Sequence, residues 1–389
     1  MSVRGQLVSA GVTGTNGKTT VVMWLAAALE AQGGPVLRTS TVGIHLGDEC
    51  LDAGVSVEGM VDALVRARRA RARFAILELT SQLLEAGFAS MWPCHVGVFT
   101  NLTHDHLDAH DHAEAYLAAK AQLFVRLSPG GTAVLNGCDP AARLIAEVTE
   151  TTARRVLYGV RQRVAPWGPL DLEASSISVS WEGTRFVLAG AGTREREVRL
   201  RAIGAHFVEN ALAALSGAVA LGVPLGSAVE TIAEAPTPPG RFEVVHRRPY
   251  VVVDYAHNPD GLVRTLEAAR ALAPSSVTLV FGAGGRRDET KRRPMGSAAR
   301  AADRIFITSD NPRDEDPRAI ALQIAEGVGA HAGVLLELDR STAIERAIRE
   351  ARDTDVVVIA GRGHEARQEL ADGSVDLSDV ELARAVMAR

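Results

Sequence analysis

The sequence predicts an α/β protein of two domains, each built on a mostly parallel sheet covered by helices. Short apolar runs alternate with longer segments of helical periodicity along most of the 389 residues, which is typical of this class. A segment with three prolines in six residues, 235–240, separates two such series and resists incorporation into a helix or a central strand. We therefore expect domains at residues 1–238 and 239–389.

The first domain is expected to alternate strands and helices along the chain. Alternating β-branched residues on either side of Trp181–Thr184 predict a small antiparallel hairpin within 172–201. The basic run Arg66–Arg73 predicts an exposed helix face. The expected strands are 74–79, 95–100 and 132–135, and the expected helices are 19–31, 113–127 and about 208–221.

The second domain repeats the alternation of strand and helix, and it predicts a Rossmann-like α/β unit. Each expected strand is a short apolar run followed by a segment of helical periodicity. The expected strands are 250–254, 276–281, 304–308, 334–338 and 356–360.

Composition excludes several classes of protein. With 42 Lys+Arg against 47 Asp+Glu, a net charge of −5 and 47% hydrophobic residues, the chain can bury one or two cores and has no broad basic field for nucleic acid. Cys50, Cys94 and Cys138 lie far apart without a CxxC pair, which predicts a reducing, cytoplasmic setting. No stretch approaches the roughly 20 apolar residues of a bilayer span, so we expect no membrane partner.

A phosphate-binding loop is predicted at residues 11–20, Gly-Val-Thr-Gly-Thr-Asn-Gly-Lys-Thr-Thr. It follows the apolar Leu7-Val8 and opens a helix, which is the context that such a loop requires. Its glycines let backbone N–H groups converge on phosphate, Lys18 supplies a cation, and the Thr19 hydroxyl is a candidate Mg²⁺ ligand. Where the strict pattern has glycine the chain has Val12, so a glycine-rich helix cap is the alternative.

Candidate metal ligands follow two further strands. Glu78 ends an apolar run, and ligand sites in open α/β sheets lie at the carboxyl ends of strands. Residues 100–112 are dense in histidine and aspartate, and His104, His106, Asp108 and His110 fall one residue out of register with a di-zinc hydrolase pattern. Beside a phosphate loop, Mg²⁺ with nucleotide is the better interpretation, and zinc hydrolysis is the weaker one.

Six motifs together resemble the Mur ligase family, ATP-dependent enzymes that join a carboxylate to an amino acid. Within that family the resemblance is greatest to the ligases that add meso-diaminopimelate to UDP-MurNAc-dipeptide, and it covers nearly the whole chain. The motifs are residues 13–20, 101–108, 116–120, 254–260, 309–313 and 361–365.

The resemblance implies ATP and two Mg²⁺ ions as cofactors. It assigns Thr19 and Glu78 to one ion, and His106 with a carbamylated Lys120 to the other; a carbamate is an oxygen donor, as a hard cation prefers. Phe207 stands where the family has the first Asn of a motif, so we expect an altered base pocket. The implied nucleotide contacts are Gly14, Thr15, Asn16, Gly17, Lys18, Thr19, Thr20, Asn210 for adenine, Asp254 for ribose and Arg241 for the phosphates.

The resemblance also implies an amino-acid site on the second domain. In the diaminopimelate-adding ligases, the arginine that matches Arg313 grips a distal carboxylate and the glutamate that matches Glu365 grips the distal ammonium. An arginine fork suits a carboxylate. The implied set is Asp310, Asn311, Arg313, Gly361 and Glu365.

The implied reaction converts a carboxylate to an acyl phosphate, which an amine then attacks. Phosphoryl transfer of this kind relies on positioning and charge neutralisation, and the expected catalytic residues are Lys18, Lys120, His106, Glu78 and Arg241. Domain closure about the 236–240 hinge is expected to exclude water from the intermediate.

Departures from the family concern the acid. The phosphate loop begins at residue 11, so we expect the family's N-terminal UDP-binding domain to be missing. Thr80-Ser81-Gln82 replaces a Ser-Ser-His run, Phe88 stands in place of a substrate-contacting arginine, and no Thr-Thr-Pro run is recognisable near 54–57. We therefore predict a smaller acid or peptide as the substrate.

Two alternatives stay open for the function, and the assembly state is a separate expectation. The first alternative to ligation of a small acid is a muramyl-peptide ligase that receives its UDP-binding part from another chain. The second is a non-catalytic nucleotide-binding subunit. As an enzyme of small-molecule substrates, it is expected to be a monomer or a weak homo-oligomer.

Overall fold

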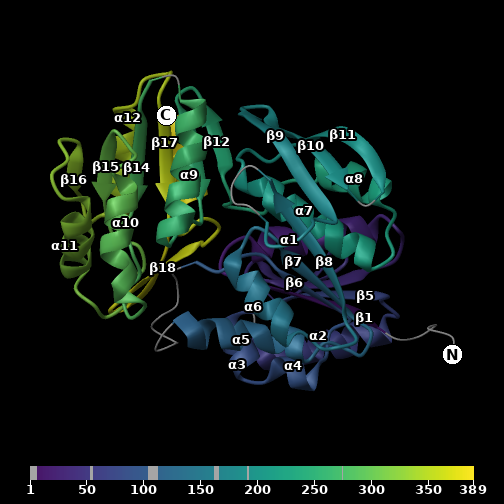
Figure 1. Ribbon diagram of the computed structural model, residues 1–389. Coiled ribbons are helices and arrows are strands. Elements are labelled where there is room, and N and C mark those ends of the chain that lie inside the picture. The colour runs from purple at the N-terminus through teal and green to yellow at the C-terminus, as the bar shows by residue number, and fades with distance from the viewer. Residues whose placement is uncertain (1–6, 53–55, 104–112, 162–165, 191, 274) are drawn as a thin grey trace. The chain divides into compact units, whose positions relative to one another are not determined.

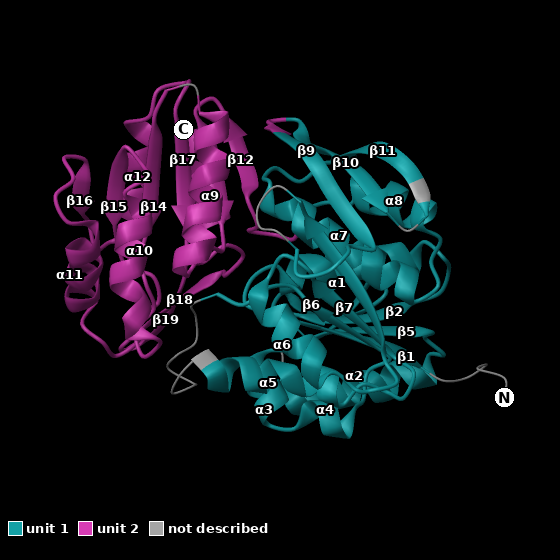
Figure 2. Ribbon diagram, in the orientation of Figure 1, with its two compact units in different colours: residues 1–103, 112–178, 182–236 teal, residues 104–111, 179–181, 237–389 magenta. Residues whose placement is uncertain are grey.

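The computed structural model describes residues 7–52, 56–103, 113–161, 166–190, 192–273 and 275–389. The chain divides into two compact units (Figure 2). Unit 1 comprises residues 1–103, 112–178 and 182–236, and unit 2 comprises residues 104–111, 179–181 and 237–389. No helix of the described part is long and apolar enough to cross a bilayer.

Unit 1 is built on a sheet whose described strands number eleven. Its central strands run parallel, in the order β8-β7-β6-β1-β5-β2, while β3–β4 extend one edge as an antiparallel meander and β9–β11 extend the other. The strands are β1 Val8–Thr13, β2 Val36–Ser40, β3 Gly43–Leu46, β4 Glu49–Asp52, β5 Phe74–Glu78, β6 Val96–Phe99, β7 Thr132–Asn136, β8 Arg154–Val160, β9 Leu172–Ser180, β10 Gly183–Gly190 and β11 Thr193–Leu200.

Helices cover both faces of this sheet (Figure 1). Helices α1, α7 and α8 lie on one face, and α2–α6 lie on the other, where they close an apolar core against the strands. The arginines of the 66–73 run are exposed, as predicted. The helices are α1 Lys18–Glu30, α2 Val57–Arg69, α3 Ser81–Glu85, α4 Phe88–Met91, α5 Ala113–Val125, α6 Pro140–Val148, α7 His206–Ala220 and α8 Leu225–Glu234.

The fold class predicted from sequence is confirmed, with two differences in unit 1. The range predicted to hold a hairpin contains three strands rather than two, because β11 pairs with β10 within it, and β9 pairs in parallel with β8. The β2–β4 meander was not predicted. Its strands are four or five residues long and carry polar residues at an edge of the sheet, so they lack a continuous apolar run.

Unit 2 contains a six-stranded sheet in the order β12-β13-β17-β14-β15-β16, parallel except for the edge strand β12. Strands β13, β14 and β17 are almost wholly apolar and buried, as expected of strands covered on both faces. The strands are β12 Glu243–Arg247, β13 Tyr250–Asp254, β14 Val277–Phe281, β15 Arg304–Ile307, β16 Val334–Leu336 and β17 Val356–Ala360.

Side-chain caps set where the helices of unit 2 begin. Asn258 caps α9 and Asp316 caps α11, each followed by proline, while Asp339 caps α12 and Ser378 caps α13. A two-stranded hairpin, β18 Arg367–Leu370 with β19 Gly373–Asp376, precedes the last helix. The helices are α9 Pro259–Leu272, α10 Arg292–Ala299, α11 Pro317–Val328, α12 Arg340–Arg349 and α13 Asp379–Met387, with a 3₁₀ turn at Glu289–Lys291.

Candidate functional site

The predicted phosphate loop joins the carboxyl end of β1 to α1. Gly14 and Gly17 both have positive φ, +142° and +87°. A Cβ at Gly14 would overlap the Thr100 hydroxyl, and a Cβ at Gly17 would overlap the Asn210 amide. Only glycine fits these two positions, which leaves the backbone accessible at the start of the helix, where anions bind.

The end of β6 holds this loop in place. Thr15 N–H donates to the Asn101 carbonyl at 2.8 Å, Asn16 N–H donates to Asn101 Oδ1 at 2.9 Å, and the Thr100 hydroxyl donates to the Asn16 carbonyl at 2.7 Å. Lys18 Nζ donates to the Thr15 carbonyl at 2.8 Å. These hydrogen bonds, three neutral and one from the Lys18 ammonium, preform the loop.

A cluster of oxygen atoms lies beside the first turn of α1, in which Thr20 is also buried. The Thr19 hydroxyl donates to Glu78 Oε2 at 3.0 Å, and the Thr41 hydroxyl lies 3.0 Å from the Thr19 hydroxyl. Thr41 N–H also donates to Glu78 Oε2 at 3.2 Å. Hydroxyl and carboxylate oxygens are the ligand types of Mg²⁺, so these residues fit that ion. Thr41 was not predicted, because it follows a short polar strand that carries no motif.

Lys120 reaches the same loop from α5. Its side chain is almost fully buried, Nζ donates to the Gly14 carbonyl at 2.8 Å, and the ammonium lies 4.2 Å from the centre of the Tyr116 ring. The Tyr116 hydroxyl in turn lies 3.4 Å from the Thr15 hydroxyl. A bare ammonium is not a ligand for a cation, whereas a carbamate formed at this position would adjoin the phosphate loop.

The rest of the predicted metal motif lies outside the described residues. His106 belongs to it, and so do His104, Asp108 and His110 of the di-zinc alternative. Within the described ranges, no cluster of three or more His, Cys, Asp or Glu residues has the arrangement of a metal site.

The expected base contact Asn210 is buried in α7 directly over Gly17. Phe207, which stands in place of a family asparagine, is 2% exposed and packs 5.9 Å from the Trp24 ring and 4.3 Å from the His206 ring. Its side chain therefore belongs to the core of unit 1. Phe88, the other aromatic departure, is likewise buried.

In unit 2, Tyr255 contacts residues from both predicted sites. The Arg241 guanidinium lies 4.3 Å from the centre of its ring, and its hydroxyl lies 3.5 Å from Glu365 Oε1. Asp254 accepts hydrogen bonds from Phe242 N–H at 2.7 Å, Ala256 N–H at 2.9 Å and the Thr265 hydroxyl at 2.8 Å. Asp254 thus anchors the turn that carries Arg241.

The predicted amino-acid residues come together on two loops. Residues 309–313 follow β15 and residues 361–365 follow β17, and Asn311 Nδ2 donates to Glu365 Oε2 at 2.8 Å. Gly361 packs directly against the Asp310 carboxylate. Burial raises the pKa of the Glu365 carboxyl, and the Asp310 charge adds to this, while the Asn311 hydrogen bond and Arg362 oppose it.

Arg313 already has an internal partner. Its Nε lies 2.7 Å from Glu369 Oε2 in the β18–β19 hairpin, and Nη1 donates to the Gly285 carbonyl at 2.7 Å. Arg287, which was not predicted, has its Cγ near Arg313: Arg287 Cγ and Arg313 Nη1 both lie within 4 Å of the position that a Cβ on Gly284 would take. The doublet at 286–287 resembles a surface charge run, so the sequence alone gave no signal for it.

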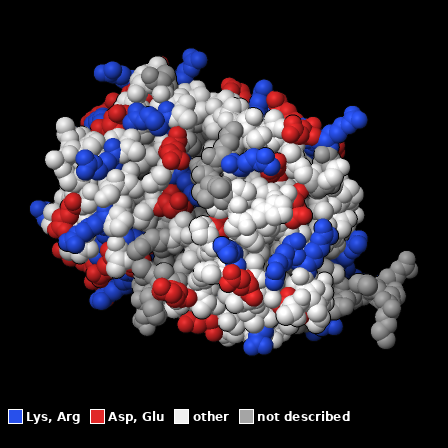
Figure 3. All heavy atoms as spheres, in the orientation of Figure 1, with Lys and Arg blue, Asp and Glu red and all other residues white. Residues whose placement is uncertain are grey.

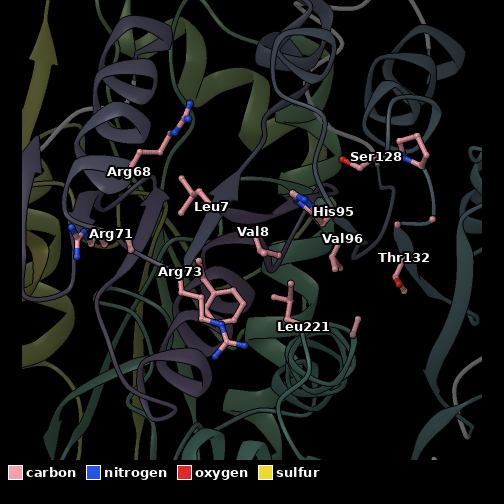
Figure 4. A pocket seen from close by; sticks show the side chains of 16 residues that line it. Leu7, Val8, Arg68, Arg71, Arg73, His95, Val96, Ser128, Thr132 and Leu221 are labelled. Atoms are coloured by element: carbon pink, nitrogen blue, oxygen red, sulfur yellow. The ribbon is translucent and has the colours of Figure 1, made fainter. Parts of the chain in front are cut away.

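A hollow of about 1150 Å³ is lined by other residues of unit 1 (Figure 4). Val8, Phe74, Val96 and Thr132 mark it at the amino ends of parallel strands, the opposite edge from the phosphate loop. It contains none of the predicted site residues. On the face drawn in Figure 3, basic and acidic side chains are interspersed rather than segregated.

Comparison with family models identifies both halves of the chain. Residues 12–218 match the Mur ligase middle domain and residues 240–363 match the Mur ligase, glutamate ligase domain. The chain belongs to the Mur ligase family. It is accordingly an ATP-dependent, Mg²⁺-using ligase that forms amide bonds, as its phosphate loop and the Thr19–Glu78 pair suggest.

Mur ligase relatives are similar along nearly the whole chain. A UDP-N-acetylmuramoyl-L-alanyl-D-glutamate–2,6-diaminopimelate ligase of Halalkalibacterium halodurans is 37% identical over 378 residues, 95% of this chain and 76% of the relative. The ligase of the same name from Thermosynechococcus vestitus is 38% identical over 387 residues, 96% and 75% of the two chains. The absence of a UDP-binding domain stays a prediction.

Solved structures agree on the fold. A structure of a ligase with that same name has a TM-score of 0.67 at 32% identity and covers 98% of this chain and 78% of its own. Folylpolyglutamate synthase of Mycobacterium tuberculosis, at 20% identity, has a TM-score of 0.75 and covers 99% and 91%. At that identity the second likeness concerns the fold alone.

Proposed function

We propose that this Mur ligase joins a small carboxylic acid or peptide to a diamino acid through an acyl phosphate. A carboxylate oxygen attacks the γ-phosphorus of ATP and ADP leaves. The amine then attacks the acyl carbon, loses a proton, and phosphate departs with the electrons of the C–O bond. The supporting observation is that the Thr19–Glu78 pair and Lys120 adjoin one preformed phosphate loop, while Asn311 and Glu365 adjoin each other in unit 2.

The residues of unit 1 hold and neutralise the nucleotide. Lys18 and the loop N–H groups bind the phosphates, and Thr19 with Glu78 holds one Mg²⁺. We assign a second ion to carbamylated Lys120 with His106. Bound Mg²⁺ would neutralise charge on the phosphates. Arg241 from unit 2 is assigned to the transferred phosphoryl group, where a fixed cation stabilises the developing charge.

The residues of unit 2 select the amino acid. Arg313 binds a distal carboxylate, assisted by Arg287, and Glu365 with Asn311 binds a distal ammonium. These charges suit a zwitterionic side-chain end such as that of meso-diaminopimelate. The names of the relatives support this choice of amino acid, since their printed substrate is 2,6-diaminopimelate.

The second candidate is ligation to a UDP-MurNAc-dipeptide, which the relatives' names favour. ADP release should be measured with Mg²⁺-ATP, meso-diaminopimelate or L-lysine, and a panel of acids that includes the UDP-MurNAc-dipeptide. We expect release that requires both an acid and an amino acid. Turnover of the muramyl peptide alone would select the second candidate, and no amino-acid-dependent ADP with any acid would refute the ligase proposal. The cytoplasmic location and the monomeric or weakly oligomeric state stay predictions.

Lys120→Ala separates an enzyme from a non-catalytic nucleotide-binding subunit. The variant should lose ligation by about 100-fold or more, because the proposed ligand and the charge balance beside the loop are both removed. Arg126→Ala, just beyond α5 and exposed, is the control and should retain activity. Unchanged ligation in Lys120→Ala would remove this residue from the mechanism.

A further inference from the structure

Arg340 lies beneath the two amino-acid loops at the start of α12. Its side chain is fully buried, and its guanidinium makes four hydrogen bonds. Nη1 donates to the Ser309 carbonyl at 3.2 Å and Nη2 donates to the Ala360 carbonyl at 3.0 Å. The remaining two go to the Asp379 carboxylate, from Nε at 2.9 Å and from Nη2 at 2.7 Å. One side chain thus connects three segments.

The Ser309 carbonyl lies in the 309–313 loop, and the Ala360 carbonyl ends β17, directly before the 361–365 loop. Ser309 precedes Asp310 and Asn311, and Ala360 precedes Gly361. Their strands, β15 and β17, do not pair with each other, because β14 lies between them in the sheet. Strand pairing therefore fixes the spacing of the loops only through a third strand, whereas Arg340 connects them directly.

Asp379 holds two arginines rather than one. It is fully buried, it pairs with Arg340, and Arg362 Nη1 lies 3.7 Å from its Oδ1. Arg362 belongs to the loop itself, and its Nη2 donates to the Leu377 carbonyl at 2.9 Å while Nε lies 3.8 Å from Glu365 Oε2. The buried charges thus extend from α13 to the proposed ammonium-binding carboxylate.

Stability alone does not explain this arrangement. Desolvating an ion pair is unfavourable, and apolar replacements of buried pairs are often neutral or stabilising. What apolar side chains cannot supply is directional donation to two carbonyls at separate loops. The observation therefore points to geometry as the role of the pair.

We propose that Arg340, oriented by Asp379, is a positioning residue that fixes the spacing of the Asn311 and Glu365 loops and so sets the affinity for the amino acid. This rests on the proposed function. Arg340 does not touch the substrate, and it acts through the Ser309 and Ala360 carbonyls. Its loss should therefore affect the amino-acid KM and leave the ATP KM unchanged.

Two variants test this. Arg340→Lys keeps a charge for Asp379 but cannot reach both carbonyls. The double variant R340M/D379N removes both charges of the pair with little change in volume and leaves an amide oxygen near Arg362. In each we expect the amino-acid KM to rise about tenfold or more, since small displacements of binding groups are costly, with the ATP KM within about twofold. Calorimetric titration of the amino acid provides a second readout.

The control matches the loss of stability. Ile344→Ala truncates a fully buried residue of α12 without touching either loop, so it should lower the Tm and leave the amino-acid KM unchanged. A folded Arg340→Lys protein with wild-type amino-acid KM would overturn the proposal, and so would an equal KM rise in Ile344→Ala. Failure of the proposed function is distinct, because it would appear as absent amino-acid-dependent ADP release in the wild type.

Discussion

The phosphate loop of unit 1 and the amino-acid loops of unit 2 are held in different ways. The phosphate loop is fixed by glycines, by hydrogen bonds with Thr100 and Asn101, and by the Lys18 and Lys120 ammonium groups, which donate to its carbonyls. The amino-acid loops are fixed by charged side chains, above all Arg340 with Asp379 and Arg313 with Glu369. The phosphate loop thus depends mainly on backbone geometry, while the loops of the proposed amino-acid site depend on paired charges that single substitutions can change.

The largest expected effect tests the backbone half of this contrast. Gly17→Ala places a methyl group against the Asn210 amide at a φ that alanine resists. We expect the rate of ADP release from ATP to fall about 100-fold or more, and we expect calorimetric titration to detect no nucleotide binding. Gly33→Ala, also at positive φ but with open space around it, is the matched control and should bind nucleotide normally. Normal binding in Gly17→Ala would show that the loop rearranges.

The next effect concerns pH and Glu365. Because the pKa of this carboxyl is raised, it becomes protonated at a higher pH than an ordinary glutamate as the solution is acidified. The amino-acid KM should therefore increase with acidification through that raised pKa, and Glu365→Gln should show a high KM without this pH dependence. A wild-type KM that stays flat down to about pH 4.5 would contradict the assignment.

The raised pKa of Glu365 also predicts how its replacement changes the stability of the protein with pH. A carboxyl whose pKa is higher in the folded than in the unfolded protein stabilises the fold when it is protonated. This contribution is complete below the unfolded-state pKa, and it is lost as the pH rises through the folded-state pKa. Glu365→Gln should therefore unfold at an equal or higher temperature than the wild type at neutral pH, and the difference should vanish in acid. A Glu365→Gln variant with a raised amino-acid KM and a raised unfolding temperature at neutral pH would identify Glu365 as a functional carboxylate.

The smallest effect tests the paired charges. Glu369 forms an ion pair with Arg313, and this partly exposed pair contributes at most about 1 kcal/mol to the free energy of unfolding. In Glu369→Gln a substrate carboxylate no longer competes with Glu369 for Arg313. The KM for meso-diaminopimelate should therefore fall about two- to fivefold, while the KM for L-lysine stays unchanged. A rise in the diaminopimelate KM would instead show that Glu369 orients Arg313 for binding.

The same contrast explains what the sequence could predict. Local patterns can be recognised in the sequence alone. They include the glycine spacing around Lys18, the apolar runs of β13 and β17 and the motif at 309–313. Arg340, Asp379 and Glu369 cannot be recognised in this way, because each stands in an ordinary context and gains its role only from tertiary contacts. Arg340 and Asp379 are 39 residues apart in the chain. Thr41 was missed for the same reason.

The β18–β19 hairpin has a consequence for redesign. It meets the 309–313 loop through Gln368, which donates to the Asp310 carbonyl, through Glu369 N–H, which donates to Asn311 Oδ1 at 2.9 Å, and through the Arg313 pair. Its far strand β19 is exposed and lies outside the six-stranded sheet. We therefore expect that exchanging the hairpin sequence would alter which amino acid the proposed site accepts, without altering the six-stranded sheet.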